Sequence, residues 1–166
     1  MVTAEEALLE EVRGLAAAVP DPEMPMVNLE DLGILRGVAR DAEGTVTVTI
    51  TPTYSGCPAM DAIRANIRER LAEHGHTRVR VRTELAPAWS TDRITAEGRR
   101  KLAEHGIAPP TGAAPAPGAA LVPLSVRCPR CGAFTTRELS RFGSTACRAL
   151  YVCESCREPF DHVKPL

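Results

Sequence analysis

The sequence lacks long apolar runs and a strong excess of charge of either sign. No apolar run approaches the roughly 18 residues that a membrane span needs. The first residues, MVTAEEALLEEV, have neither the basic start nor the apolar stretch of a signal peptide. The formal net charge is only -1, so the molecule as a whole does not attract nucleic acid. We therefore expect a cytoplasmic protein that binds neither a membrane nor nucleic acid.

Charge is also missing from one internal stretch. No charged residue occurs between Gly106 and Val126, and five of the fourteen prolines of the chain lie in this stretch. Such a composition cannot build a core, and its prolines favour extended conformations. The sequence therefore predicts a Pro/Ala-rich linker over residues 106–123, between a domain over residues 1–105 and a small domain over residues 124–166.

The pattern of the first piece is typical of a small α+β domain. A capping box at Thr3 begins a helix that Pro20 ends. A hairpin turn joins two predicted strands, GILRGVA and TVTVTIT. The next predicted element is a helix that ends at Gly75. TRVRVRTEL is a third strand, whose arginines form a solvated face, and TAEGRRKLAEH is a last helix interrupted by Gly98. The predicted order is α-β-β-α-β-α, with helices that cover a small sheet.

The second piece is too small to fold by hydrophobic burial alone. It contains two Cys-x-x-Cys motifs, a spacing that lets a tight turn direct two thiolates at one ion. Four such sulfurs fill a tetrahedral site and leave no position for water, which predicts a zinc ribbon with a structural Zn²⁺; cysteine spacing does not exclude iron. The predicted ligands are Cys128, Cys131, Cys153 and Cys156.

Two further residues lie near these motifs. Cys147 is an additional thiol that could be an alternative ligand, a reactive group or a packed small residue, and we favour the packed residue. His162 follows the last motif, and a surface or supporting position is more common for such a histidine than ligation. In a reducing compartment, all six cysteines indicate metal or thiol chemistry rather than disulfides.

Cys57 stands between Gly56 and Pro58, where a strand pattern changes to a helical one. A sulfur at a helix start faces unpaired backbone N–H groups and the positive end of the helix dipole, both of which favour the thiolate. Buried free cysteines are also common. The residues alone leave both a working thiol and an inert packed residue open.

Several segments resemble known families. Three segments are similar to the iron-sulfur assembly domain of SufT-type proteins: DPEMPMVNLEDLGIL, TPTYSGCPAMDAI and PAWSTDRITAEGRRKL. That domain has a Gly-Cys-Pro cysteine, matched by Cys57, and an Asp-Pro-Glu segment, matched by Asp21, Pro22 and Glu23. With the CPRCG and CESCREPF segments added, nearly the entire chain, excluding the linker, resembles the PaaD (PaaJ) family of bacterial phenylacetate degradation.

This resemblance implies an accessory component of the phenylacetyl-CoA epoxidase, a multicomponent di-iron oxygenase with an iron-sulfur flavoprotein reductase. The expected partners are its oxygenase and reductase subunits. The sequence lacks the two Glu-x-x-His motifs of a di-iron site and a dinucleotide fingerprint, so we expect no autonomous catalysis.

The leading hypothesis is a maturation factor in which Cys57, with Asp21 or Glu23, transiently holds iron or a cluster. The alternatives are a structural adaptor with an inert Cys57, or a thiol enzyme with His74, His76 or His105 as its base.

Overall fold

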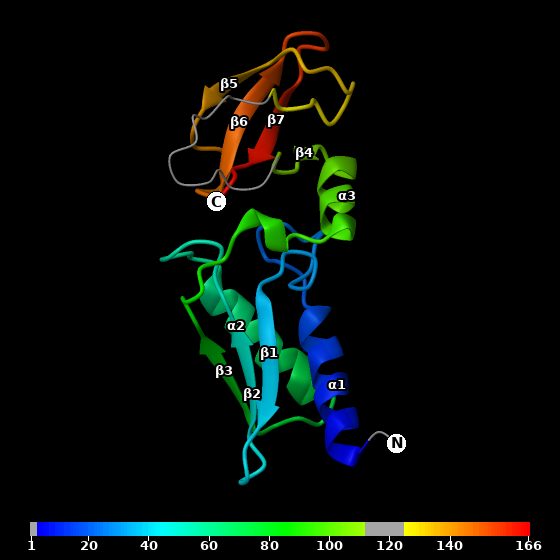
Figure 1. The fold of residues 1–166 in the computed structure, drawn as a ribbon, viewed down its shortest axis with the longest axis vertical. Helices are drawn as coiled ribbons and strands as arrows, with labels where there is room; N and C mark the ends of the chain where they lie inside the picture. Colours follow the sequence, from blue (N-terminus) through cyan, green and yellow to red (C-terminus); the bar gives the residue numbers. More distant parts are fainter. Residues whose placement is uncertain (1–2, 112–124) are drawn as a thin grey trace. The chain divides into compact units, whose positions relative to one another are not determined.

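The computed structural model describes residues 3–111 and 125–166. By its internal contacts the chain divides into two units, Met1–Trp89 and Ser90–Leu166. Figure 1 shows helices packed on a three-stranded sheet in the first unit and a separate sheet in the second. The predicted α+β class, with a ribbon after the helix-covered sheet, is confirmed.

The first unit contains two helices and one sheet. The helices are α1 (Ala4–Ala17) and α2 (Met60–Glu73), and the strands are β1 (Leu35–Arg40), β2 (Val46–Ile50) and β3 (Val79–Thr83). The capping box between Thr3 and Glu6 is present at the start of α1. β1 and β2 form the predicted hairpin, whereas β2 and β3 are parallel and are connected through α2.

The core of this unit lies between the sheet and the two helices. Alternate residues of β2 are buried, as the period of two requires. The apolar stripe of α2 covers that face, and α1 packs against both β1 and α2. The fully buried side chains include Val12, Val48, Ile50, Ile63, Ile67 and Leu71.

Buried polar contacts hold the segment between α1 and β1. The side chain of Asn28 accepts the backbone N–H of Asp31 over 2.8 Å, and the side chain of Asp31 accepts the backbone N–H of Asn28 over 3.0 Å. The buried indole of Trp89 donates to the carbonyl of Leu32 over 2.7 Å. The Trp89 bond attaches the last residue of the first unit to residues 31–33, in which Gly33 has a φ of 65°.

The second unit begins before the ribbon. It contains the short 3₁₀ helix η1 (Thr91–Arg93), α3 (Ala96–Glu104) and β4 (Ile107–Ala108). The ribbon strands are β5 (Thr136–Ser140), β6 (Arg148–Cys153) and β7 (Pro159–Val163). The strand order is β4-β7-β6-β5, in which β4 runs parallel to β7 and the other neighbours are antiparallel.

This division differs from the predicted one at residues 90–111. α3, predicted as the last helix of the first domain, contacts β4 and belongs to the second unit, and it continues through Gly98. Ile107 and Ala108, predicted as linker, pair with Asp161 and His162, because β7 offers an unpaired edge. Residues 112–123 of the predicted linker lie outside the described residues.

Candidate metal centre and the Cys57 turn

The two Cys-x-x-Cys motifs form turns with the same backbone hydrogen bonds. In the first turn, Gly132 N–H donates to the Cys128 carbonyl over 3.0 Å, and Cys128 N–H donates to the Ala133 carbonyl over 2.9 Å. In the second turn, Arg157 N–H donates to the Cys153 carbonyl over 2.9 Å, and Cys153 N–H donates to the Glu158 carbonyl over 3.0 Å. Each turn therefore directs two sulfurs to the same side.

The residue after the second cysteine of each turn has a left-handed backbone. Gly132 has a φ of 78° and Arg157 a φ of 65°. Glycine adopts this conformation without strain, whereas a side chain such as that of arginine disfavours it. Its occurrence at Arg157 shows that the turn geometry is imposed by the site and not by local preference.

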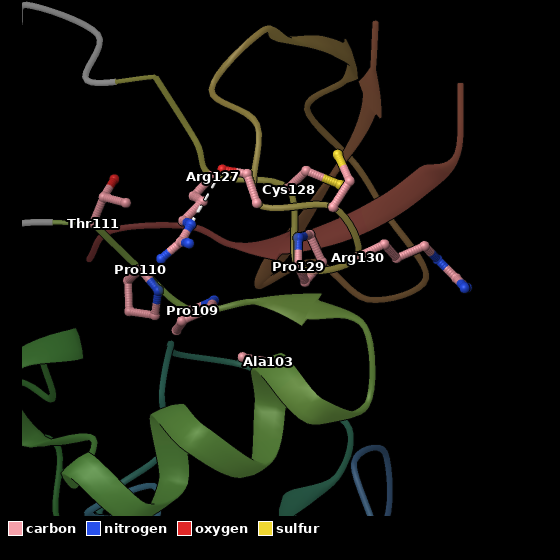
Figure 2. A pocket seen from close by; sticks show the side chains of 10 residues that line it. Ala103, Pro109, Pro110, Thr111, Arg127, Cys128, Pro129 and Arg130 are labelled. Atoms are coloured by element: carbon pink, nitrogen blue, oxygen red, sulfur yellow. Dashed lines mark hydrogen bonds between the residues drawn. The ribbon is translucent and has the colours of Figure 1, made fainter. Parts of the chain in front are cut away.

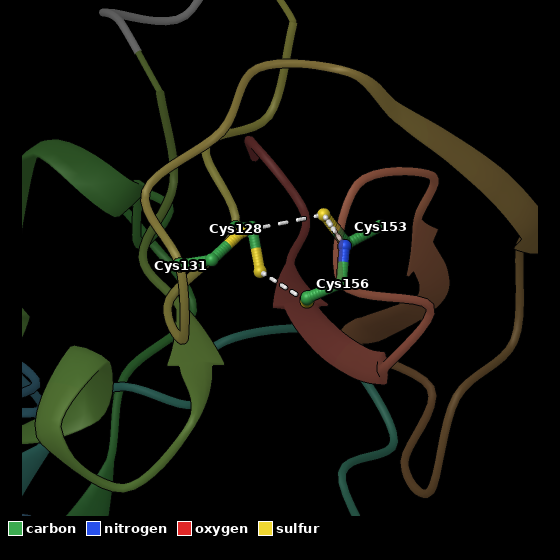
Figure 3. Close-up of side chains that lie close together, drawn as sticks. All are labelled: Cys128, Cys131, Cys153 and Cys156. Atoms are coloured by element: carbon green, nitrogen blue, oxygen red, sulfur yellow. Dashed lines mark hydrogen bonds between the residues drawn. The ribbon is translucent and has the colours of Figure 1, made fainter.

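The four sulfurs of Cys128, Cys131, Cys153 and Cys156 converge, as Figure 3 shows. They all lie within 4.8 Å of one another. Sγ of Cys128 lies 3.8 Å from Sγ of Cys156, and Sγ of Cys131 lies 3.5 Å from Sγ of Cys153. Sulfurs bound at about 2.3 Å in a tetrahedron are separated by about 3.8 Å. The arrangement therefore fits one metal ion with four thiolates, since a multinuclear cluster would spread the sulfurs over several ions.

The electrostatics of the cluster also require a cation. The backbone N–H of Cys156 donates to Cys153 Sγ over 3.5 Å and lowers the pKa of the Cys153 thiol to about 6. A backbone hydrogen bond from Glu158 lowers the pKa of Cys156, but burial and the neighbouring thiols outweigh it and raise that pKa overall. Four thiolates this close become compatible only when a metal ion compensates their charge.

Burial separates the four ligands into two kinds. Cys128 and Cys153 are buried and belong to the small core of the ribbon, together with Ala108, Val126 and Phe160. Cys131 is exposed and Cys156 is half-buried. The metal centre and the core of the ribbon are thus one structure, with one side of the centre near solvent.

Neither Cys147 nor His162 joins this cluster within the residues that the structure describes. Cys147 is buried, and its Sγ lies 3.1 Å from the hydroxyl oxygen of Thr145. His162 is buried and its Nδ1 lies 3.2 Å from the carbonyl oxygen of Ala108 in β4. Burial lowers the pKa of this histidine, so the neutral ring is favoured.

A cavity of about 480 Å³ lies beside the first turn of the centre. In Figure 2, Ala103, Pro109 and Pro110 line one side of it, and Arg127 and Pro129 line the other. The α3–β4 segment, which the sequence alone did not place near the ribbon, therefore contributes one wall of the space next to the metal ligands.

Cys57 lies in the connection between β2 and α2. Its N–H donates to the Tyr54 carbonyl and its carbonyl accepts from Met60 N–H, both over 3.3 Å, and Gly56 has a φ of 85°. The helix begins at Met60 with Ala59 as its N-cap, so Cys57 precedes the N-cap by two residues. The thiol is half-buried.

The topology makes this connection a favourable place for a site. β2, α2 and β3 form a parallel β-α-β unit, and loops at the carboxyl ends of parallel strands are frequent binding sites. Thr51, which follows β2 directly, was not predicted. Its side chain is 1% exposed, and its hydroxyl has no hydrogen-bond partner among the described residues.

Asp21 organises the turn in which it lies. Its side chain is buried, and Oδ1 accepts the backbone N–H groups of Glu23 and Met24, each over 2.8 Å. Glu23 is half-buried in the same turn. Within the described part of the chain, Cys57, Asp21 and Glu23 do not bring three ligand atoms together as the four ribbon cysteines do.

The histidines considered as bases for a thiol enzyme lie at helix ends. Nδ1 of His74 contacts the Arg70 carbonyl and Nδ1 of His105 contacts the Lys101 carbonyl, each over 2.8 Å. His76 lies with Nε2 3.5 Å from a carboxylate oxygen of Glu11 in α1. These contacts are those of helix-end residues and give no support to a Cys-His pair.

Two family models match the chain. Residues 9–82 match the iron-sulfur cluster assembly protein family, and residues 113–164 match the PaaD zinc beta ribbon domain. Segment 90–111, which the structure assigns to the second unit, falls between the two matches. None of the helices in the described ranges is long and apolar enough to cross a membrane.

A solved structure and two protein sequences resemble the chain. A crystal structure of a domain of unknown function, DUF59, from Bacillus anthracis has a TM-score of 0.55 and 26% identity over 60% of this chain and 94% of its own. The Fe-S protein maturation auxiliary factor of Porphyromonas gingivalis is 35% identical over 56% of this chain and 89% of its own length.

The second sequence covers nearly the whole molecule. The putative 1,2-phenylacetyl-CoA epoxidase subunit of Escherichia coli is 48% identical over 154 residues, which are 93% of this chain and 91% of that protein. This similarity spans both units. The two-unit fold, the four converging cysteines and this similarity together show that the chain belongs to the PaaD family.

Proposed function

We propose that this protein is an accessory maturation factor of a 1,2-phenylacetyl-CoA epoxidase and assists assembly of an iron-sulfur or di-iron centre in the partner subunits. The observation that carries the proposal is the Cys57 turn, a half-buried thiol at the carboxyl end of a parallel strand in a domain of the iron-sulfur assembly family. The similarity to a protein named as an epoxidase subunit supports the choice of client.

Cys57 is the residue that would hold the cargo. A thiolate is a suitable ligand for iron and for iron-sulfur species. A single thiolate with few additional ligands holds such cargo weakly, which suits transfer better than storage. Glu23 lies in a turn that Asp21 organises, and we assign Asp21 chiefly to this organising role, with Glu23 as the candidate carboxylate.

The ribbon has a different task in this proposal. We infer that its four cysteines hold a structural Zn²⁺, because four sulfurs complete the shell and leave no position for a substrate. The ribbon then serves to recognise a client subunit. None of the six cysteines, all of which lie among the described residues, forms a disulfide, which agrees with a cytoplasmic location.

The test compares epoxidase made with three versions of this protein. Cells that carry the wild type, Cys57→Ala or Cys147→Ala would supply the oxygenase and reductase components, and iron and sulfide would be measured in each component. We expect a deficit only with Cys57→Ala, and recovery when iron, sulfide and wild-type protein are added together. The Cys147 variant is the control for removal of a thiol outside the cluster.

A second measurement separates maturation from an adaptor role. A maturation factor acts before turnover, so epoxidase assembled in its presence should keep its activity after the factor is removed. Two results together would contradict the maturation role: equal metal content in all preparations, and activity that requires stoichiometric addition of this chain. They would show that the protein is a working adaptor subunit.

A further inference from the structure

The connection between β5 and β6 carries an exposed aromatic side chain on the ribbon. Phe142 is 72% exposed, and Leu139 in β5 is 47% exposed. We call Leu139, Arg141, Phe142 and Lys164 the Phe142 surface. An exposed phenylalanine and an exposed leucine three positions apart in the chain are unfavourable in water, and exposed apolar patches mark interaction sites in folded proteins.

The strand next to this surface is shaped to present it. Among the strands that the structure describes, β5 is the outer one of its sheet and pairs with β6 alone. Its register with β6 shifts between Glu138 and Ser140, so that Leu139 occupies an irregular position. Bulges turn side chains away from the regular alternation and are frequent at sheet edges. The exposure of Leu139 is therefore a consequence of the backbone path.

A largely buried polar network supports the connection that carries Phe142. Arg148 donates to Asp161 over 3.1 Å and to the Thr145 hydroxyl over 2.9 Å, and Ser144 donates to the same carboxylate over 2.6 Å. The side chains of Arg148 and Asp161 are only 8% and 19% exposed. This network ties Ser144 and Thr145 of the loop to Arg148 in β6 and Asp161 in β7.

The backbone around Phe142 is equally constrained. Phe142 N–H donates to the Ser140 hydroxyl over 3.1 Å, and Gly143 N–H donates to the Arg148 carbonyl over 2.8 Å. A Cβ at Gly143 would lie 2.7 Å from Asp161 Oδ1, so this position needs glycine for close approach. A loop fixed in advance loses little conformational entropy on binding, which favours an aromatic anchor.

Positive charge borders the ring. The Lys164 amine lies 5.2 Å from the centroid of the Phe142 ring and donates to the Arg141 carbonyl. The Arg141 side chain is 87% exposed, and its guanidinium reaches Glu138 only at 4.0 Å. A complementary surface therefore presents an apolar pocket for the ring with carboxylates at its rim.

We propose that the Phe142 surface is the site at which the ribbon docks onto a client, a folded protein with an apolar pocket bordered by carboxylates. This inference rests on the proposed function, because it takes the epoxidase components as the source of that client. Phe142 is the anchor that enters the pocket, and Arg141 and Lys164 provide the electrostatic steering.

The experiment measures binding of the full-length protein to the purified oxygenase and reductase components of the epoxidase from the same source. We expect Phe142→Ser to weaken the binding about 30-fold, the size typical of an interface anchor. Arg141→Glu should weaken it and reduce its dependence on salt. The matched control is Phe134→Ser, because Phe134 is 61% exposed and precedes β5 at its other end. The affinity of this variant for the epoxidase components should differ from that of the wild type by less than about threefold.

Metal content and the circular dichroism of each variant report whether the ribbon remains folded. Wild-type affinity in Phe142→Ser, or no binding of the wild type to any component, would overturn the proposal. Conversion of a wild-type dimer to a monomer by Phe142→Ser, with client binding unchanged, would identify a second copy as the occupant and would also overturn it. The Cys57→Ala variant should bind the epoxidase components with wild-type affinity. If this variant also supports maturation, the function assigned to Cys57 is wrong, whereas the docking site is unaffected.

Discussion

Removal of the exposed ligand Cys131 should unfold the second unit and leave the first intact. Cys131 is the informative ligand because, unlike Cys128 and Cys153, it lies outside the small buried core of the ribbon. Cys131→Ser therefore changes the metal centre with little change in packing. Any loss of structure then reports the contribution of the metal.

The expected magnitude follows from the size of that core. Its buried members that are not ligands are Ala108, Val126 and Phe160. Burial of a valine or phenylalanine side chain contributes about 1.5–3 kcal/mol, so this core contributes only a few kcal/mol. Structural Zn²⁺ contributes about 10–16 kcal/mol in zinc-finger peptides. Loss of one of four thiolates therefore removes more free energy than so small a unit has in reserve.

The assay combines metal analysis with an NMR spectrum of the amide groups. The single tryptophan, Trp89, is a reporter of the first unit, because its indole N–H is buried against the Leu32 carbonyl. We expect its indole signal to persist in Cys131→Ser while the ribbon signals collapse to unfolded positions. Cys147→Ser is the control, since it alters a buried thiol outside the cluster. A folded, metal-free ribbon in Cys131→Ser would refute the reasoning.

Three further predictions concern other contacts. Asp21→Ala should lower the free energy of unfolding of the first unit by about 2–3 kcal/mol, as measured by urea denaturation, because two backbone N–H groups lose their acceptor. Asp21→Asn should lower this free energy by less. Burial lowers the pKa of His162, so the unfolded chain is protonated at higher pH than the folded one. The second unit should therefore lose stability as the pH falls below about 6.5, with a shallower fall in His162→Gln at fixed zinc concentration. A fragment of residues 113–166 should unfold at a lower temperature than one of residues 90–166, because it lacks the strand that pairs with β7; equal melting temperatures would contradict this.

The local patterns of the sequence were sufficient for much of the fold. The capping box at Thr3, the hairpin between β1 and β2 and each of the two Cys-x-x-Cys turns depend on residues close together in the chain. Short-range hydrogen bonding and a fixed side-chain period specify such features directly. The ligand set could be predicted because two residues between cysteines suit a single turn geometry, whereas the meeting of the two turns joins residues 22 and 28 positions apart.

Other features depend on contacts between distant residues. β4 exists because Ile107 and Ala108 meet the free edge of β7, and no local pattern identifies that partner. The buried carboxylate of Asp21 holds a turn, although its position in a motif indicated a metal ligand. The buried Arg148–Asp161 pair, which supports the connection that carries Phe142, joins residues 13 positions apart. The sequence alone thus determined most of the helices and strands and the four ribbon ligands. Tertiary structure decided β4, the division of the chain and the support of each site, because pairing and burial depend on which surfaces meet.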